Sequence, residues 1–378
     1  MSCFQGMFFL LGEIMMNDDL RYMKLAMDLA AKGKGWVNPN PMVGAVIVKN
    51  QAIIGQGYHR QFGGLHAERE ALANCQEDPS GATIYVTLEP CCHWGKTPPC
   101  TEALIEAGIQ RVVVACLDPN LLVAGKGVER LKAAGISVDV GILADQVSDQ
   151  LRYFFHYIRT GRPYVVCKYA MTLDGKIASR TGDSQWITGP LAREQVHRQR
   201  HEFMAIMVGI NTVLQDDPLL TCRLAGNYRQ PVRIICDRQL RLPLDSQLVR
   251  SASQVPTLVV SSSQNHSKIE QLQAHKVEVI QVNANESGID LSALLSILGE
   301  KGIDSLYVEG GAQIHGSLVD LGLVNEFQIY LGNQVLGGDQ SPSPIAGQGF
   351  AKMNQALTTN LKEIQQFGKD IFLRMEVE

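Results

Sequence analysis

Three separated segments of the sequence carry side chains that could form a metal centre. Glu68 stands two residues after His66, and Cys91 and Cys100 each follow a proline. One imidazole and two thiolates can hold a tetrahedral Zn²⁺ and leave its fourth position for water. Zinc lowers the pKa of such a water toward 7, which makes a nucleophile available at neutral pH. Glu68 could take the proton of that water and pass it to a leaving nitrogen.

The spacing of the cysteines leaves alternatives open. The order His-x-Glu, then Pro-Cys-x-x-Cys, is the signature of zinc nucleobase deaminases, whereas eight residues separate Cys91 from Cys100. A structural zinc would need a fourth protein ligand, which Cys92 or His93 could supply, and Cys92 could replace Cys91. Buried cysteines without metal are a further alternative. We favour one open catalytic zinc per chain, because His-x-Glu and Pro-Cys flank a predicted strand in the right order.

Composition excludes several classes of protein. The chain has 378 residues, 45% of them hydrophobic and 19% charged, as expected for a globular protein and not for a disordered or fibrous one. Its 34 Lys and Arg against 38 Asp and Glu give a net charge of −4, so neither nucleic acid nor membrane is an expected partner. Nine cysteines in so long a chain favour reduced thiols and a cytoplasmic location. Residues 7–11 are apolar but lack a preceding Lys or Arg, so we interpret residues 1–16 as a disordered extension.

Hydrophobic periodicity predicts the elements that position these residues. In the first half, strands are predicted at 43–48, 52–57, 83–88, 111–117 and 136–140, and helices at 18–32, 67–75, 101–107, 127–134 and 144–158. The pattern is interrupted at residues 160–163. After this interruption, strands are predicted at 164–170, 204–208, 232–236, 257–260, 277–282, 305–308 and 326–331. Helices are predicted at 190–201, at 291–299 and after residue 311, a loop at 340–349 and a hairpin over 361–377. Such alternation predicts two α/β domains, 17–161 and 162–378, each with a sheet covered on both faces.

Several motifs in order resemble the bifunctional riboflavin-biosynthesis deaminase–reductases, over about residues 17–375. The segments that match the deaminase half are 38–44, 66–68, 87–91 and 95–100, and those that match the reductase half are 168–176, 184–188, 211–218 and 308–311. The resemblance implies a cytidine-deaminase-like α/β/α domain followed by a dihydrofolate-reductase-like α/β domain. It also implies the substrate 2,5-diamino-6-ribosylamino-4(3H)-pyrimidinone 5′-phosphate, which the first half deaminates. The second half then uses NADPH to reduce the ribosyl group to ribityl.

The resemblance also implies roles for individual residues. In the deaminase half it implies His66, Cys91 and Cys100 as zinc ligands, Glu68 as proton shuttle, and Asn40 and His59 in the same pocket. In the reductase half it implies substrate contacts from Ser184, Arg200, Leu220, Arg223 and Glu309. It implies NADPH contacts from Ala170, Trp186, Thr212, Asp216, Gly311, Ala312, Gln313, Ile314, His315, Gly316 and Ser317.

The residue types in the reductase half agree in part with the roles that the resemblance implies. Arg200 and Arg223 could grip a phosphate through two hydrogen bonds each, although a solvated helix face and a surface ion pair would explain them equally well. Gly311 opens a predicted helix after a strand, where backbone N–H groups can face a cofactor phosphate. The absence of G-x-G-x-x-G speaks against a Rossmann fold. No side chain in 162–378 stands out as a general acid.

Some positions depart from the family pattern, and two rival functions remain open. Cys92 stands where Ser is expected, Leu121 where Pro is expected, and 332–334 differ from the usual Pro-Lys pattern. One rival is a nucleoside or tRNA deaminase fused to an unrelated domain, and the other is a non-catalytic zinc-stabilised binding protein. We expect a small-molecule substrate and a homo-oligomer, either a dimer or a tetramer.

Overall fold

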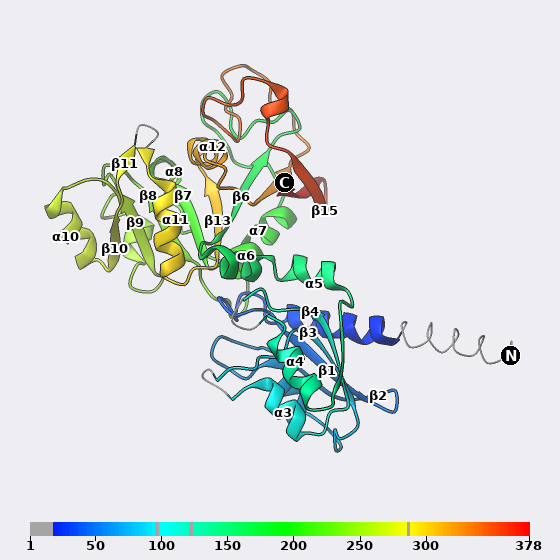
Figure 1. The fold of residues 1–378 in the computed structure, drawn as a ribbon. Helices are drawn as coiled ribbons and strands as arrows, with labels where there is room; N and C mark the ends of the chain where they lie inside the picture. Colours follow the sequence, from blue (N-terminus) through cyan, green and yellow to red (C-terminus); the bar gives the residue numbers. More distant parts are fainter. Residues whose placement is uncertain (1–17, 95–97, 121–123, 286–287) are drawn as a thin grey trace. The chain divides into compact units, whose positions relative to one another are not determined.

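The computed structural model describes residues 18–94, 98–120, 124–285 and 288–378 (Figure 1). The expected extension 1–16, residues 95–97 of one motif and the departure at 121 lie outside the described residues. The chain divides into two compact units after Thr160. Each unit is an α/β fold, as predicted.

The first unit is built on one five-stranded sheet, ordered β2-β1-β3-β4-β5. Its strands are β1 (Gly44–Lys49), β2 (Ala52–Tyr58), β3 (Thr83–Leu88), β4 (Arg111–Cys116) and β5 (Ser137–Val140). β1 pairs antiparallel with β2 and β3, whereas β3, β4 and β5 run parallel. Its helices are residues 18–31, α2 (Ala67–Ala73), α3 (Cys100–Glu106), α4 (Lys126–Ala133), α5 (Ala144–Gln150) and α6 (Arg152–Thr160).

Hydrophobic cores cover both faces of this sheet. Ala45 and Ile47 of β1 belong to one buried cluster, and the alternate residues Val46 and Val48 belong to another. Because successive side chains of a strand point to opposite faces, both faces are apolar and the strand reads as one hydrophobic run. The single helix predicted over 144–158 is wrong in one respect, since the structure ends α5 at Gln150 and starts α6 after it.

The second unit contains a nine-stranded sheet, ordered β10-β9-β8-β7-β13-β6-β14-β16-β15. Its strands are β6 (Tyr164–Met171), β7 (Ala205–Gly209), β8 (Val232–Cys236), β9 (Thr257–Ser261), β10 (Val277–Gln281), β13 (Ser305–Gly310), β14 (Glu326–Leu331), β15 (Thr359–Phe367) and β16 (Asp370–Val377). Neighbouring strands run parallel from β10 to β14, and the hairpin β15–β16 joins antiparallel. A small pair, β11 (Ala284–Asn285) and β12 (Gly288–Ile289), forms a separate sheet.

Helices of very different length accompany the second sheet. They are α7 (Pro190–Glu202), α8 (Ile210–Asp216), α9 (Gln247–Arg250), α10 (His266–Ala274), α11 (Leu291–Glu300), α12 (Ala312–Asp320) and the 3₁₀ turn η1 (Met353–Gln355). Helices α8, α9 and α10 were not predicted from the sequence. The first two are too short to show a helical period, and α10 buries only Leu272.

Parallel strands bring their carboxyl ends to one edge of the second sheet. At this edge β7 leads into α8, and β13 leads through Gly311, whose φ is +87°, into α12. Ligands of open α/β sheets bind at such an edge. In the described part of the chain, no helix combines the length and apolar character needed to cross a membrane.

Candidate functional site

The three predicted metal ligands come together in the first unit. His66 caps α2, Cys91 follows β3, and Cys100 is the first residue of α3. Nδ1 of His66 lies 3.5 Å from Sγ of Cys91 and 3.4 Å from Sγ of Cys100. All three ligand atoms lie within 4.8 Å of one another. This is the donor set of a tetrahedral zinc with one open position.

Local hydrogen bonds favour the charged form of one thiol. The Cys100 thiol and His66 lower the pKa of Cys91 to about 4, and the Cys100 backbone N–H adds a contact of 3.3 Å to the Cys91 sulfur. A thiolate is the form that binds metal. Cys92 and His93, the alternative ligands, do not belong to this cluster among the described residues.

Glu68 lies beside the ligands in the first turn of α2. Its side chain is buried, with 3% exposed, and it lines a cavity of about 400 Å³ together with His66 and Cys91. Burial raises the pKa of Glu68 to about 7. A carboxyl group with a pKa near the operating pH can both accept and return a proton.

Asn40 and His59 line the same cavity, as the resemblance implies. Nδ1 of His59 lies 2.8 Å from the carbonyl oxygen of Leu65, and Nε2 lies 3.2 Å from Nδ2 of Asn40. The Leu65 carbonyl can only accept, so Nδ1 carries the proton and Nε2 accepts from the Asn40 amide. Burial lowers the pKa of His59, which agrees with a neutral ring.

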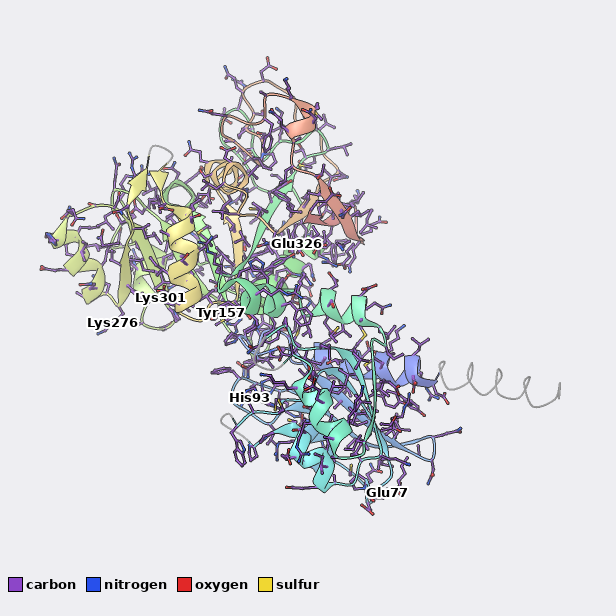
Figure 2. The ribbon with its side chains drawn as sticks, viewed as in Figure 1. Glu77, His93, Tyr157, Lys276, Lys301 and Glu326 are labelled. Carbon is purple, nitrogen blue, oxygen red and sulfur yellow. The ribbon has the colours of Figure 1, made fainter. Side chains whose placement is uncertain are left out.

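Glu89 and Asp118, which the sequence did not indicate as site residues, also line this cavity, as does His93, considered above only as an alternative zinc ligand (Figure 2 labels His93). Glu89 is buried, and its carboxylate accepts four backbone N–H groups. The donors are those of Asp118, Gly125, Gly127 and Val128, at 2.9–3.2 Å. These bonds hold the start of α4 against the cavity wall. Glu89 could have been recognised in the sequence as an acidic residue directly before Pro-Cys at the end of a buried strand.

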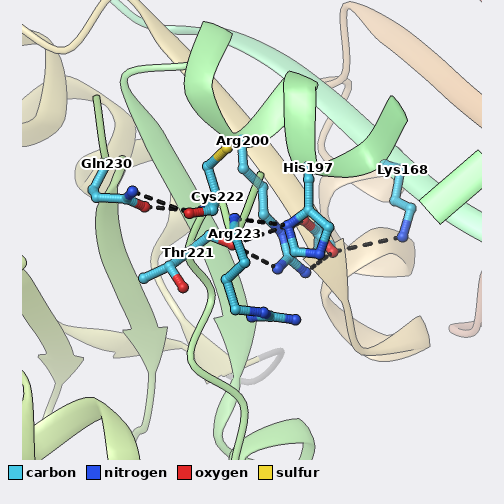
Figure 3. Close-up of polar contacts among 8 residues, drawn as sticks. Lys168, His197, Arg200, Thr221, Cys222, Arg223 and Gln230 are labelled. Carbon is cyan, nitrogen blue, oxygen red and sulfur yellow. Dashed lines mark hydrogen bonds and ion pairs between the residues drawn. The ribbon is translucent and has the colours of Figure 1, made fainter. Parts of the chain in front are cut away.

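The second unit has a cavity of about 440 Å³ built around a buried ion cluster (Figure 3). Nε and Nη2 of Arg200, on α7, donate to the two carboxylate oxygens of Glu309 at 2.6 and 2.9 Å. Nζ of Lys168, on β6, lies 3.5 Å from the same carboxylate. These cations hold the pKa of Glu309 low, at about 2, against the effect of burial.

This cluster changes the expectation for Arg200. The guanidinium fork that was expected to grip a phosphate is already taken by Glu309, and Nη1 donates to the Thr221 carbonyl oxygen at 3.1 Å. Arg223 is exposed and lines the cavity, and its backbone N–H donates to Nδ1 of His197 at 3.3 Å.

Lys168 and Leu220 also differ from expectation. Lys168 lines the cavity, and burial lowers the pKa of its ammonium group, so it is a candidate proton donor where the sequence indicated none. Lys168 could have been recognised in the sequence as a lysine inside an otherwise apolar strand. Leu220, expected at the substrate, is buried in a hydrophobic cluster and does not line the described cavities.

A cavity of about 740 Å³ lies at the carboxyl edge of the same sheet. The expected cofactor residues that line it are Thr212, Asp216, Gly311, Ala312, Gln313, Ile314 and Ser317. Ala170 and Trp186 line the 440 Å³ cavity instead, and Ser184 lines both. Since one residue borders both cavities, a ligand in one can approach a ligand in the other.

Two expected cofactor residues face away from this cavity. The ring nitrogens of His315 lie 3.1 and 3.2 Å from the carbonyl oxygens of Pro344 and Val308, and the side chain is buried. A Cβ on Gly316 would lie 1.9 Å from the carbonyl oxygen of Ala346. Both residues pack α12 against the chain and do not line the described cavities.

Comparison with known proteins identifies both units. Residues 16–116 match the family described as cytidine and deoxycytidylate deaminase zinc-binding region, and residues 163–373 match the RibD C-terminal domain. The riboflavin biosynthesis protein RibD of Actinobacillus pleuropneumoniae is 50% identical over 355 residues, which cover 94% of each chain. That of Escherichia coli is 38% identical, over 94% of this chain and 99% of its own.

Solved structures agree with these relatives. RibD of Acinetobacter baumannii superposes with a TM-score of 0.87 at 38% identity, over 96% of this chain and 99% of its own. A diaminohydroxyphosphoribosylaminopyrimidine deaminase/5-amino-6-(5-phosphoribosylamino)uracil reductase from Thermotoga maritima gives 0.86 at 37% identity, over the same shares of the two chains. The N-terminal deaminase-like and C-terminal reductase domains confirm the expected fold class. The chain therefore belongs to the RibD family, the bifunctional deaminase–reductases of riboflavin biosynthesis.

Proposed function

We propose that this enzyme deaminates 2,5-diamino-6-ribosylamino-4(3H)-pyrimidinone 5′-phosphate and then reduces the product's ribosyl group to ribityl. Residues 17–161 form the deaminase domain and residues 162–378 the reductase domain. The observation that carries the proposal is the cluster of His66, Cys91 and Cys100 beside buried Glu68 in one cavity.

In the deaminase domain, Glu68 is the residue that moves the proton. The cluster of His66, Cys91 and Cys100 fits Zn²⁺ in donor type and spacing, and zinc bound there supplies a Lewis acid that lowers the pKa of water. Glu68 takes the proton from the attacking water and delivers it to the pyrimidine 2-amino nitrogen. The C2–O bond forms, the C2–N bond breaks and ammonia leaves. Asn40 and His59 bind the ring from the same cavity.

In the reductase domain, Lys168 supplies the proton, and NADPH, when bound, would supply a hydride to C1′. The Lys168 ammonium group would give its proton to the ribose ring oxygen, whose bond to C1′ breaks as the new C1′–H bond forms. Glu309 holds Lys168 in position and shares its charge with Arg200. Arg223 and Ser184 contact the substrate, and Arg223 binds its phosphate.

The larger cavity suits a dinucleotide. Its volume of about 740 Å³ lies within the usual range for ligand pockets. The first turn of α12, which begins at Ala312 in its wall, has backbone N–H groups that the helix itself does not use. These groups could hold the diphosphate of NADPH, and Ala170 and Trp186, which line the 440 Å³ cavity, could contact its nicotinamide.

The assembly and location of the enzyme are part of the proposal. We expect a dimer or tetramer of identical chains in the cytoplasm, where reduced cysteines can bind zinc. Size-exclusion chromatography with light scattering on the full chain tests the assembly, and a monomer at micromolar concentration would contradict it.

An assay for released ammonia separates this function from the rival nucleoside or tRNA deaminase. The enzyme is expected to release ammonia from the pyrimidine ribosyl phosphate and not from cytidine or a tRNA substrate. Ammonia release from cytidine alone would support the rival instead. The family assignment of both domains already speaks against it.

A further inference from the structure

Arg69, on α2, forms hydrogen bonds with the segment that leads into the third metal ligand. Its Nε donates to the carbonyl oxygen of Pro98 at 3.2 Å, and its Nη2 donates to that of Pro99 at 3.1 Å. Cys100 is the next residue and the first of α3. The guanidinium group therefore holds two consecutive peptide groups directly before a ligand.

The two prolines limit how this segment can be held. Proline lacks a backbone N–H, so Pro98 and Pro99 can form hydrogen bonds only through their carbonyl oxygens. Pro99 is the N-cap of α3, and its side chain gives no capping hydrogen bond. The backbone N–H of Cys100 lies 3.3 Å from Sγ of Cys91, a contact within the metal cluster itself. The two hydrogen bonds from Arg69 join this segment to α2.

The helix α2 is itself fixed to the sheet of the first unit, so it can support the segment. Glu70, the residue after Arg69, accepts the backbone N–H of Tyr58, on β2, at 2.9 Å, and also pairs with Arg60. Ala67, at the start of the helix, is buried in the core. Hydrogen bonds from Arg69 therefore connect the segment before Cys100 to a rigid part of the domain.

Holding this segment bears on metal binding, because a ligand that is already in place costs less to order. Eight residues separate Cys91 from Cys100, and fixing the backbone of such a segment has an entropic cost. Among the residues that the structure describes, Arg69 pairs with no carboxylate, so the two carbonyl oxygens do not compete with an acidic partner. Hydrogen bonds from a charged donor are stronger than neutral ones. Removing a group that orients metal ligands typically lowers metal affinity about 10- to 100-fold.

We propose that Arg69 is a positioning residue of the deaminase, which holds the two prolines so that Cys100 stays at the metal centre and zinc binds more tightly. The inference rests on the proposed function in one respect, because it requires the cluster of three ligands to bind zinc. It gives α2 a third role, beside the ligand His66 at its cap and the proton-transferring Glu68 in its first turn.

The zinc affinity of the full-length enzyme tests this inference without turnover. Zinc is partitioned at equilibrium between a chelator of known affinity and the wild type, Arg69→Ala or Arg69→Lys. Arg69→Ala should bind zinc about 10- to 100-fold more weakly. Arg69→Lys should fall between the two, because an ammonium group keeps the charge but lacks the planar edge that donates to two carbonyl oxygens at once.

Arg130→Ala is the matched control. Arg130, on α4, also donates twice to α3, at 2.8 Å, but its acceptor is the carboxylate of Glu102 and not the segment before Cys100. Its zinc affinity should therefore change by less than about twofold. Equal losses of zinc affinity in Arg69→Ala and Arg130→Ala would show that both residues act only by stabilising α3, and would overturn the inference.

Thermal unfolding of the same proteins separates positioning from folding. Added zinc should raise the Tm of the wild type and of Arg130→Ala by similar amounts, and that of Arg69→Ala by less, because tighter binding stabilises more at the same zinc concentration. If Arg69→Ala does not fold, Arg69→Lys decides, and wild-type zinc affinity in the lysine variant would then contradict the inference. Unchanged zinc affinity in a folded Arg69→Ala would overturn the inference and leave the proposed function intact. A wild type that binds no zinc would refute the proposed metal centre and the inference with it.

Discussion

The two candidate active sites differ in how far apart their residues lie in the sequence. His66 and Cys100 of the metal cluster are 34 residues apart, on segments that flank β3. Arg200 and Glu309 of the reductase cluster are 109 residues apart, on α7 and β13. When the residues of a site come from nearby segments, the site can be recognised in the sequence from residue types and their spacing. When the residues come from distant strands and helices, the site can be recognised only from contacts that form in the folded protein.

Loss of one zinc ligand is expected to have the largest effect and to separate the activities of the two domains. Cys100→Ser is expected to remove zinc and reduce deamination below detection, while reduction of pre-deaminated substrate continues. The two domains have separate cores, so metal loss should damage only one of them. Zinc content by mass spectrometry and separate assays of the two half-reactions provide the measurement. Cys75→Ser, outside the cluster, is the control, and a Cys100→Ser enzyme with full zinc would refute the ligand assignment.

Glu68→Gln should separate chemistry from metal binding within the same cavity. The variant keeps the shape of the side chain but cannot carry the proton, so deamination should fall about 10²- to 10⁴-fold with zinc retained. Zinc content and kcat for ammonia release are measured on one preparation. Loss of zinc in this variant would make Glu68 a structural residue.

Lys168→Met should remove the proposed proton donor of the reductase domain. Removing the proton donor is expected to slow reduction by about a hundredfold or more and to leave deamination unchanged. Burial lowers the pKa of Lys168, so wild-type reduction should fall as pH rises through a value below 10.5, because the ammonium group loses its proton there. NADPH absorbance across the pH range measures both effects. A variant with wild-type kcat and an unchanged profile would show that Lys168 donates no proton.

Arg223→Ala is expected to have the smallest effect. It removes one charge-assisted phosphate contact of about 1.5–3 kcal/mol, or roughly ten- to a hundredfold in kcat/KM. With a dephosphorylated analogue the loss should nearly vanish. Arg198→Ala, an exposed residue of α7 outside the cavity, serves as control. Equal losses with and without phosphate would move Arg223 to the cofactor or to the fold.

The sequence predicts the local features of this protein well. Alternating apolar strands and helices yield both α/β units, and His66, Cys91 and Cys100 are found from residue type and spacing alone. The pairing of Arg200 with Glu309 could not be found this way, because nothing near either residue in the sequence indicates the other. Lys168 and Glu89 were missed for a similar reason, since their partners are a distant carboxylate and the backbone N–H groups of a later helix.

We propose that the zinc-dependent domain must act before the NADPH-dependent domain. The most direct measurement is zinc content per chain, together with NADPH oxidation by enzyme with and without zinc. We predict one zinc per chain. We also predict that zinc removal stops NADPH oxidation with the diamino substrate, and that adding pre-deaminated substrate restores it. Full NADPH oxidation by zinc-free enzyme with the diamino substrate would show that reduction does not require prior deamination.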